Sequence, residues 1–423
     1  MISFTPSPEH TAWVQKAERL KPLFAKRARA LDERGGSPEE NMAILRDEGF
    51  HKLVVPAEYG GFGTDAAWCA FTPHAVIETL ASACASTAWG LLSHYHGIGL
   101  IVGLGNEEQR RRILTDVVAN GAMVATVGSE VRARETNTVG NATGKLTFAS
   151  ELRPVEGGFV ANGTKGFSSM GADSKYICYW SLAPGTDLPS TGVTVSVIEK
   201  PHPGVVSLPG WEEAMGIRAS LSGGTKFEDV FIPWENVLGE PGDHMQVHTY
   251  TFELTYTVHL LGIAQGVFDF VRQAMAERPF LQSDDTLMYS VGEMASMIQA
   301  TRASWYYAQW LWDEGDHHEA AHASLKALHQ AKDTAMMVCT KAFEAVGVRA
   351  LFRWNPIERA WRDARTVTLH TRESLLMRVV AEAEVSGHRF AKQKYGVRVP
   401  EEDRVTWASL GLPRPQPSIQ GAE

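Results

Sequence analysis

The sequence predicts an α+β fold that is mostly α, with a helical N-terminal domain, a central β domain and a C-terminal helical bundle. Apolar residues recur at helical spacing to about residue 122, and short β-rich runs separated by glycine occupy residues 123–242. Helical spacing then returns over residues 243–398, and residues 399–423 read as an extended C-terminal arm. The length of 423 residues, 44% of them hydrophobic, fits two or three domains.

Composition excludes several classes of function. The net charge is −9 and basic residues form no sustained cluster, which argues against a nucleic-acid partner. The longest apolar runs are too short for a membrane span, and the first residues lack the layout of a signal peptide. Four separated cysteines without a CxxC pair indicate buried thiols in a reducing cytoplasm and no metal site: Cys69, Cys84, Cys178 and Cys339.

Two helix starts can be expected in the N-terminal domain. In "SPEENMAILRDEGF", Ser37 and Glu40 have the spacing of a capping box. In "GNEEQRRRILTDVV", Asn106 is the expected N-cap, and Glu107 and Glu108 follow in the first turn, where the helix dipole favours them.

The central region contains the β-rich runs "GGFVANGTKGFSS", "KYICYWSLA", "GVTVSVIEK" and "GTKFEDVFIP". Alternation within "TVSVIEK" predicts strands with one buried face. We expect the Gly-Thr-Lys stretch at 163–165 to form a hairpin turn.

The C-terminal region predicts long helices, among them "TYTFELTYTVHLLGIAQGVFDFVRQAMAER". In "DHHEAAH" (316–322) the adjacent histidines diverge on a helix, so this stretch predicts a solvated helix face and not a metal site. The tail from residue 400 carries four prolines and is expected to be extended or partly disordered.

Several motifs, in order along the chain, resemble those of the acyl-CoA dehydrogenase superfamily of flavoproteins. They are "VPAEYGGFG" (55–63), "GNEEQRRRIL" (105–114), "ANGTKGFSSMGADSKYICYW" (161–180), "MGIRASLSGGTKFEDVFIPWENVLG" (215–239) and "ERAWRDART" (358–366). The resemblance implies an N-terminal helical domain, a central β-barrel or sandwich and a C-terminal four-helix bundle, usually in a homotetramer.

Two departures from the family pattern bear on function. In "TLHTRE" (368–373), His370 stands where the family carries its catalytic glutamate, and Glu373 is expected to point elsewhere. The stretch "FEAVGVRALF" (343–352) lacks part of the glycine-rich loop that accommodates FAD, and its Arg349 suits a terminal phosphate. Arg278 matches an arginine that reaches the flavin phosphates of a neighbouring subunit.

Both departures resemble the two-component flavin monooxygenases typified by dibenzothiophene monooxygenase, through "RTVTLH" (365–370) and Phe167-Ser168-Ser169. The resemblance implies reduced FMN (FMNH2) in preference to FAD, supplied by a separate flavin reductase. With O2 it would form a C4a-hydroperoxyflavin that oxygenates a small aromatic or heterocyclic substrate.

The same resemblance assigns site residues. Phe167 and Ser169 would lie beside the flavin ring, and Ser129 would also contact the cofactor. Trp211 would line the substrate pocket. His370 would donate to the peroxide and shuttle a proton, which an ionised glutamate cannot do.

Other possibilities remain open. His94 and His96 lie near an active-site histidine of the monooxygenases, but two residues apart on a helix they diverge, so at most one faces a given pocket. The first alternative function is an acyl-CoA dehydrogenase with Glu253 as base. The others are an N-oxygenase of an amino sugar or amine, and a non-catalytic binding subunit with the flavoprotein fold.

Overall fold

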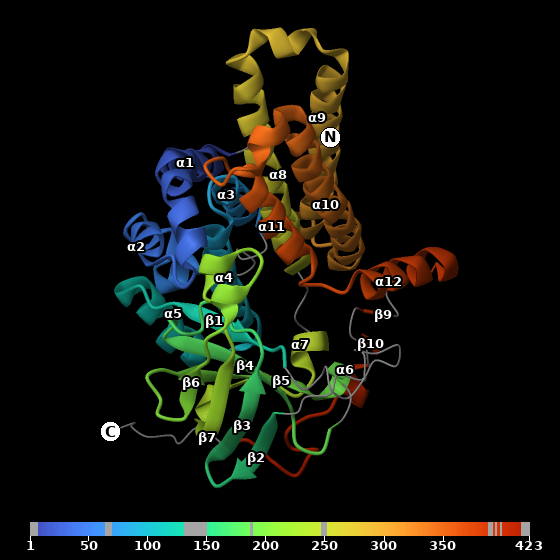
Figure 1. The fold of residues 1–423 in the computed structure, drawn as a ribbon. Coiled ribbons are helices and arrows are strands. Elements are labelled where there is room, and N and C mark those ends of the chain that lie inside the picture. Colours follow the sequence, from blue (N-terminus) through green and yellow to red (C-terminus); the bar gives the residue numbers. More distant parts are fainter. Residues whose placement is uncertain are drawn as a thin grey trace.

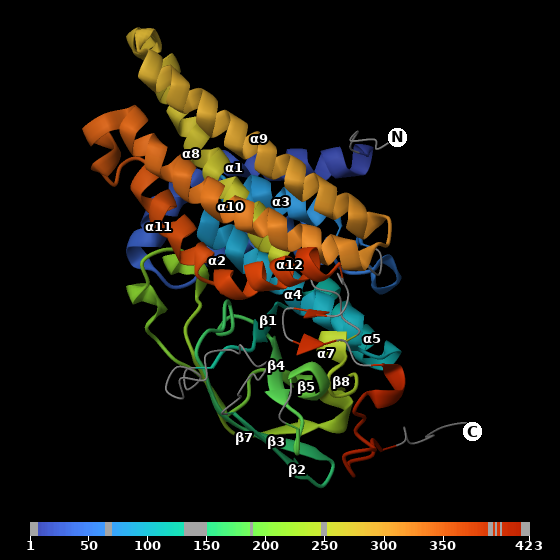
Figure 2. The ribbon, with the colours of Figure 1, turned by 90° about the vertical axis from the view of Figure 1, so that its right-hand side faces the viewer.

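The computed structural model describes residues 7–63, 70–130, 150–186, 189–246, 252–387, 392–393, 396–397 and 400–415. Helices occupy one side of the molecule and the strands the other (Figures 1 and 2). The N-terminal domain consists of α1 (Pro8–Arg34), α2 (Glu39–Asp47), α3 (Phe71–Ala81), α4 (Ala85–Leu104) and α5 (Glu107–Asn120).

The central domain holds two four-stranded sheets. The first has the order β1-β4-β5-β8, with β1 (Val124–Val127), β4 (Tyr176–Leu182), β5 (Val193–Glu199) and β8 (Val237–Leu238). The second has the order β2-β3-β7-β6, with β2 (Glu151–Val155), β3 (Gly158–Lys165), β7 (Thr225–Pro233) and β6 (Val205–Ser207). Only β1 and β4 pair in parallel among these eight strands of the described chain. The short α6 (Pro189–Gly192) and α7 (Asp243–Gln246) flank the first sheet.

The C-terminal bundle consists of α8 (Phe252–Ala276), α9 (Asp285–Asp313), α10 (His317–Val346) and α11 (Ile357–Thr368), followed by α12 (Glu373–Ser386). The two-residue strands β9 (Lys392–Gln393) and β10 (Gly396–Val397) pair beyond it. The fold class expected from the sequence is therefore confirmed. Among the described helices, α8 is long and apolar enough to cross a membrane, but 72% of its most apolar window is buried, as in a core helix.

Helix α4 positions the functional site. Every residue of α4 except Gly103 is buried, between the N-terminal helices, β1 and α8. Gly97 allows this packing, because a β-carbon there would lie 2.4 Å from the Val124 side chain. Any polar side chain on α4 is consequently enclosed by protein, with partners fixed by the fold.

Three local expectations were tested by the structure. Asn106 is the N-cap of α5 and forms a full capping box with Gln109, as predicted. The prediction of a capping box at Ser37 was wrong. Pro38 is the N-cap of α2, and the Ser37 hydroxyl donates to Asp173 in the β domain. A tertiary hydrogen bond thus replaces the local one.

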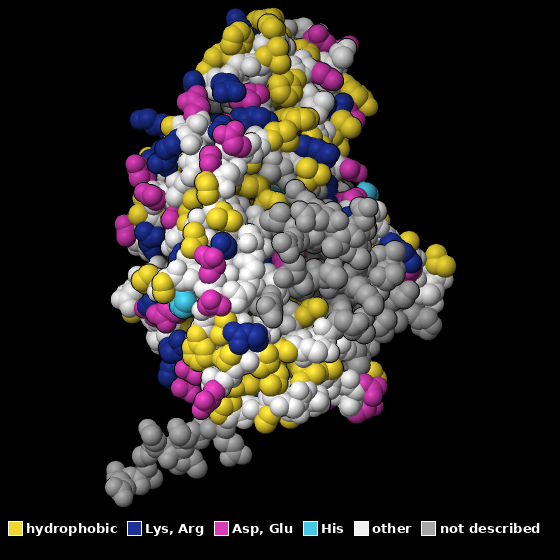
Figure 3. Space-filling model, turned by 60° about the horizontal axis from the view of Figure 1, so that its bottom comes forward, with side chains coloured by type: hydrophobic (Ala, Val, Ile, Leu, Met, Phe, Trp, Pro, Cys, Tyr) yellow, Lys and Arg dark blue, Asp and Glu magenta, His cyan; other side chains and the backbone are white. Residues whose placement is uncertain are grey.

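The prediction of a hairpin turn at residues 163–165 was also wrong. These residues lie inside β3, where Gly163 has φ 130° at a β-bulge, and the chain reverses instead at Gly157. The described part of the C-terminal arm is folded, since Trp407 is 1% exposed and packs on Phe159 and Trp234. Burial of a large aromatic side chain outweighs the extended preference of the neighbouring prolines. On the face in Figure 3, basic and acidic side chains are interspersed.

A candidate active site around Trp89, Ser169 and His370

Trp89 on α4 is the centre of an aromatic cluster. Its ring centroid lies 4.3 Å from that of His370 and 5.2 Å from that of His259, and it stacks on Tyr256 at 5.5 Å. The Trp89 side chain is 3% exposed, so its indole N–H needs a partner within the protein. That partner is the Ser169 hydroxyl, at 2.9 Å.

The Ser169 hydroxyl belongs to a chain of serines between α4 and the β domain. It shares a hydrogen with Ser222 at 2.7 Å, and Ser222 in turn lies 2.8 Å from the Ser220 hydroxyl. Ser93, one turn beyond Trp89 on α4, donates to the Ser169 carbonyl at 3.1 Å. Two residues of one helix face therefore fix both the backbone and the side chain of Ser169.

His370 follows the last turn of α11 and is held in one tautomer. Its Nδ1 lies 3.2 Å from the Thr366 carbonyl, which can only accept, so Nδ1 carries the hydrogen. His370 is an exposed residue, but the protein atoms around its ring reduce its hydration and lower the pKa of His370 to about 4. With this pKa the imidazole is neutral at physiological pH, and its Nε2 can accept a hydrogen bond.

Of the two glutamates that could serve as a thioester base, Glu373 is engaged by α10 and Glu253 is buried on α8. Glu373 begins α12 and points to α10, where Lys332 donates to it at 2.5 Å and His329 lies at 2.5 Å. Burial raises the pKa of Glu373, but these two partners outweigh burial and lower it overall. Glu253 is 2% exposed in the first turn of α8, one turn before Tyr256.

A surface suited to a flavin ring adjoins Ser169. Phe167 is 43% exposed, and its ring lies perpendicular to that of Trp211 at 5.8 Å. The Trp211 indole is anchored by its bond to the Ile217 carbonyl at 3.0 Å. Ser129, beyond the end of β1, is exposed and its carbonyl accepts from the Gly166 N–H. Exposed aromatic faces next to hydroxyl groups fit an isoalloxazine ring, which is planar with a polar edge.

The structure separates the two histidines of α4. The His94 ring is fully buried: its Nε2 donates to the His51 carbonyl, and its Nδ1 accepts from the Val124 N–H at 3.0 Å. His94 therefore has a structural role between the domains. His96 lies on the same helix face as Trp89, with its ring 5.8 Å from Tyr256 and its Nε2 2.6 Å from the Thr255 hydroxyl.

His259 on α8 is a further polar group beside Trp89. Its Nε2 donates to the Ala85 carbonyl at 2.8 Å, and within the described chain its buried Nδ1 has no hydrogen-bond partner. Burial lowers the pKa of His259 to about 4, so the ring is neutral.

Sequence reasoning missed Trp89, Tyr256 and His259, because aromatic residues in apolar helices usually read as core. The available signal was helical spacing. Trp89 lies four residues before Ser93 and seven before His96, which places all three on one face of α4.

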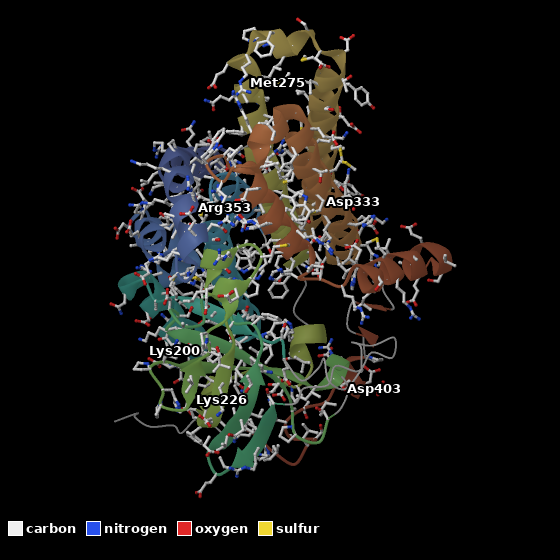
Figure 4. All side chains as sticks on the ribbon, in the orientation of Figure 1. Lys200, Lys226, Met275, Asp333, Arg353 and Asp403 are labelled. Atoms are coloured by element: carbon white, nitrogen blue, oxygen red, sulfur yellow. The ribbon has the colours of Figure 1, made fainter. Side chains whose placement is uncertain are left out.

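Arg278 and Arg349 lie far from this cluster within one chain. Tyr256 and Ala276 are twenty residues apart on α8, which corresponds to about 30 Å, and Arg278 follows that far end of the helix, which the label Met275 marks in Figure 4. Arg349 is exposed in the 3-10 turn Gly347–Leu351, before the start of α11, whereas His370 lies beyond its end.

Comparison with known proteins agrees with this architecture. Residues 7–121 match the acyl-CoA dehydrogenase N-terminal domain, and residues 254–374 match the C-terminal domain, together more than half of the chain. The chain is 27% identical over 404 residues to dibenzothiophene monooxygenase of Rhodococcus erythropolis, covering 88% of this chain and 91% of that protein. It is 28% identical over 366 residues to cyclohex-1-ene-1-carbonyl-CoA dehydrogenase of Geobacter metallireducens, covering 84% and 92%.

Solved structures of both kinds of enzyme share the fold. The complex of TdsC from Paenibacillus with FMN and indole superposes with a TM-score of 0.79 at 22% identity, over 91% of this chain and all of that one. The glutaryl-coenzyme A dehydrogenase complex with glutaryl-CoA gives 0.81 at 21% identity, over 94% of this chain and all of that one. Overall similarity in sequence and fold therefore does not distinguish an oxygenase from a dehydrogenase. The residues of the site have to make this distinction.

Proposed function

Since the chain belongs to the acyl-CoA dehydrogenase family, we propose that it is a flavin-dependent monooxygenase of the two-component type. It would use reduced FMN and O2 to oxygenate a small aromatic or heterocyclic substrate. The observation that carries this proposal is the neutral His370 ring, held against Trp89 at 4.3 Å, where the dehydrogenases place an ionisable glutamate.

The chemistry of the site supports oxygenation over thioester oxidation. A thioester base must be an available carboxylate with a suitable pKa, whereas Glu373 is committed to Lys332 and His329. The reduced flavin would supply activation of O2. The chain would supply the buried aromatic ring of Trp89 against His370, and a neutral Nε2 of His370 that can take up and return one proton.

The proposal assigns the flavin ring to the surface formed by Phe167, Ser169 and Trp211, with Ser129 at its border. The Ser169 hydroxyl would contact the polar edge of the ring, since Trp89 and Ser222 already fix its position. Tyr256, which is only partly buried, would present an aromatic face to the substrate, with the buried Trp89 ring stacked behind it. Dibenzothiophene and indole, named with two of the similar proteins, are planar aromatic molecules of the class that such faces bind.

We further propose a homotetramer in which Arg278 and Arg349 bind the flavin phosphate of a neighbouring subunit. Arg278 lies about 30 Å along α8 from the Trp89 cluster of its own chain, too far to reach a flavin bound there. Sedimentation or light scattering should give four times the chain mass of 46.4 kDa. Arg278→Gln should weaken FMN binding without dissociating the assembly.

Two experiments test the function. Purified protein with FMN, NADH and a separate flavin reductase should convert indole or dibenzothiophene to oxygenated products, detected by mass spectrometry with ¹⁸O2. Without the reductase it should neither oxidise NADH nor form product. The second experiment mixes protein that carries oxidised flavin with acyl-CoA thioesters in the absence of O2. Bleaching of the flavin there would contradict the proposal and favour the dehydrogenase alternative with Glu253 as base.

A further inference from the structure

A cavity of about 620 Å³, separate from the candidate active site, opens between the two helical domains. Its lining comes from residues 21–29 of α1, 81–85 before and at the start of α4, 263–273 of α8 and 353–363 around the start of α11. Phe167, Ser169, Trp211 and His370 are not among the lining residues, and neither is any residue of the β domain. In Figure 4, Arg353 marks this place, where α1 meets the segment before α11. The volume is within the range of small-molecule sites.

Charge distinguishes this cavity from the rest of the protein. The whole chain has a net charge of −9, but the cavity is lined by more basic than acidic side chains. The basic ones are Lys21, Lys26, Arg29, Arg353 and Arg359, and the acidic ones are Asp269 and Asp363. A concave surface with excess positive charge concentrates anions.

The basic side chains differ in how far they are already neutralised. Lys21 pairs with Glu18 and Arg29 pairs with Glu33 on the same helix. Within the described chain, neither Lys26, Arg353 nor Arg359 forms a salt bridge. Lys26 and Arg353 therefore remain available to a ligand. Arg359 forms no salt bridge, although its charge already acts on Asp363 one turn along α11. Guanidinium groups can bind phosphate or carboxylate through two hydrogen bonds.

The floor of the cavity is mainly apolar, with one committed carboxylate. Asp363 is 4% exposed and accepts the Ile217 N–H at 2.6 Å, which ties α11 to the β domain. Around it lie the apolar side chains of Ala85, Ile263, Val267 and Phe270. An apolar floor under a basic rim is complementary to a molecule with an apolar body and an anionic head.

We propose that this cavity is a second binding site, for a small organic anion with an apolar body and a phosphate or carboxylate head. Arg359 would bind the head, and Lys26 and Arg353 would attract it at the rim. The site lies close to the aromatic cluster, because Ala85 lines the cavity and its carbonyl holds His259 beside Trp89.

Isothermal titration calorimetry with phenyl phosphate and benzoate tests the proposal on the full-length protein saturated with FMN at low ionic strength. We expect saturable binding of one or both at millimolar concentrations or below, and none of phenol. Arg359→Gln should weaken binding about tenfold or more, whereas Arg359→Lys should retain part of it. Arg19→Gln is the matched control, since Arg19 is exposed on α1 and does not line the cavity.

Three outcomes would overturn the proposal. These are no binding at about 10 mM, equal binding by Arg359→Gln, or binding of phenyl phosphate to FMN-free protein that is lost on saturation with FMN, which would make the cavity part of the flavin site. Should Arg359→Gln fail to fold, the double variant Lys26→Gln with Arg353→Gln changes only exposed rim residues and must weaken binding in its place. These readouts do not depend on catalysis, so they remain decisive if the proposed oxygenase activity is not found.

Discussion

At the residue scale, the proposed chemistry depends on one neutral imidazole. The Thr366 carbonyl fixes the hydrogen of His370 on Nδ1, which leaves Nε2 as the acceptor. Because the pKa of His370 is lowered to about 4, the acceptor form persists throughout the neutral range. A glutamate in this position would be anionic and would carry a different electrostatic field into the site.

We expect His370→Ala to reduce the yield of oxygenated product about 10²–10³-fold, the loss typical of one positioned hydrogen-bonding group in an active site. FMN binding should change little, because the flavin surface is formed by other residues. The measurement is product and H2O2 formed per O2 consumed. His329→Ala is a suitable control, since His329 is exposed on α10 and contacts Glu373. Unchanged coupling in His370→Ala would remove His370 from the proposed chemistry.

The hydrogen bond between Trp89 and Ser169 allows a double-mutant cycle. Trp89→Phe removes the indole N–H but keeps an aromatic ring against His370 and Tyr256, and Ser169→Ala removes the acceptor. If Trp89 acts by positioning Ser169, each variant should lower turnover about tenfold, and the double variant should be no worse than the worse single one. Additive losses in kcat/KM would show that the two residues act independently.

The sequence predicted part of this site through motif position. His370, Ser169, Phe167 and Trp211 lie in segments whose order and spacing resemble a known family, so their residue types could be interpreted. Trp89 lies on the apolar helix α4, and Tyr256 and His259 lie on the apolar helix α8. Their proximity depends on how the helices cross, which periodicity within one helix does not encode.

At the element scale, a sequence motif predicted a helix start correctly where its hydrogen-bond partners lie within the same helical turn. Asn106 and Gln109 satisfy each other within one turn of α5. Ser37 offers the same sequence signal, but Asp173 of the β domain competes for its hydroxyl. The bulge at Gly163 and the burial of Trp407 likewise arise from contacts between distant segments. The sequence pattern located the strands and the tail but not these contacts.

The two helix starts can be compared directly. Asn106→Ala should lower the free energy of unfolding by about 1 kcal/mol, because the Gln109 N–H loses its side-chain partner. Ser37→Ala should change it by less than about 0.5 kcal/mol, since Ser37 is not a cap and lies at the surface. Urea denaturation followed by circular dichroism measures both. An equal cost for the two substitutions would contradict the assigned helix starts.

At the scale of the whole molecule, α4 connects all three domains, and buried neutral histidines accompany it. His94 joins α4 to the 3-10 turn at Phe50–Lys52 and to β1, while His259 joins α8 to the start of α4. His74 on α3 bonds to Gln309 of α9 at 2.6 Å. The three rings are fully buried, so protonating any of them would place a charge in the core.

This arrangement predicts that stability falls as the pH is lowered from neutral. Burial lowers the pKa to about 4 for His74 and His259 and to about 3 for His94, from an ordinary value of 6.5. Below pH 6.5 the unfolded chain therefore binds protons that the folded chain does not. Proton binding lowers the free energy of the unfolded chain, so the free energy of unfolding decreases. Asp363 acts in the opposite direction, because burial raises its pKa to about 6 and the folded chain binds a proton first.

The net effect of these three histidines and Asp363 should be uptake of about two protons on unfolding near pH 5, or a slope of roughly 2–3 kcal/mol per pH unit. Urea denaturation at several pH values between about 5 and 7, at constant protein concentration, measures this slope. His74→Gln can keep a polar group facing Gln309 and should reduce the slope by about one proton equivalent. A wild-type protein whose stability rises or stays constant towards pH 5 would show that these histidines become hydrated, and that the enclosure of α4 by the three domains is looser than its burial indicates.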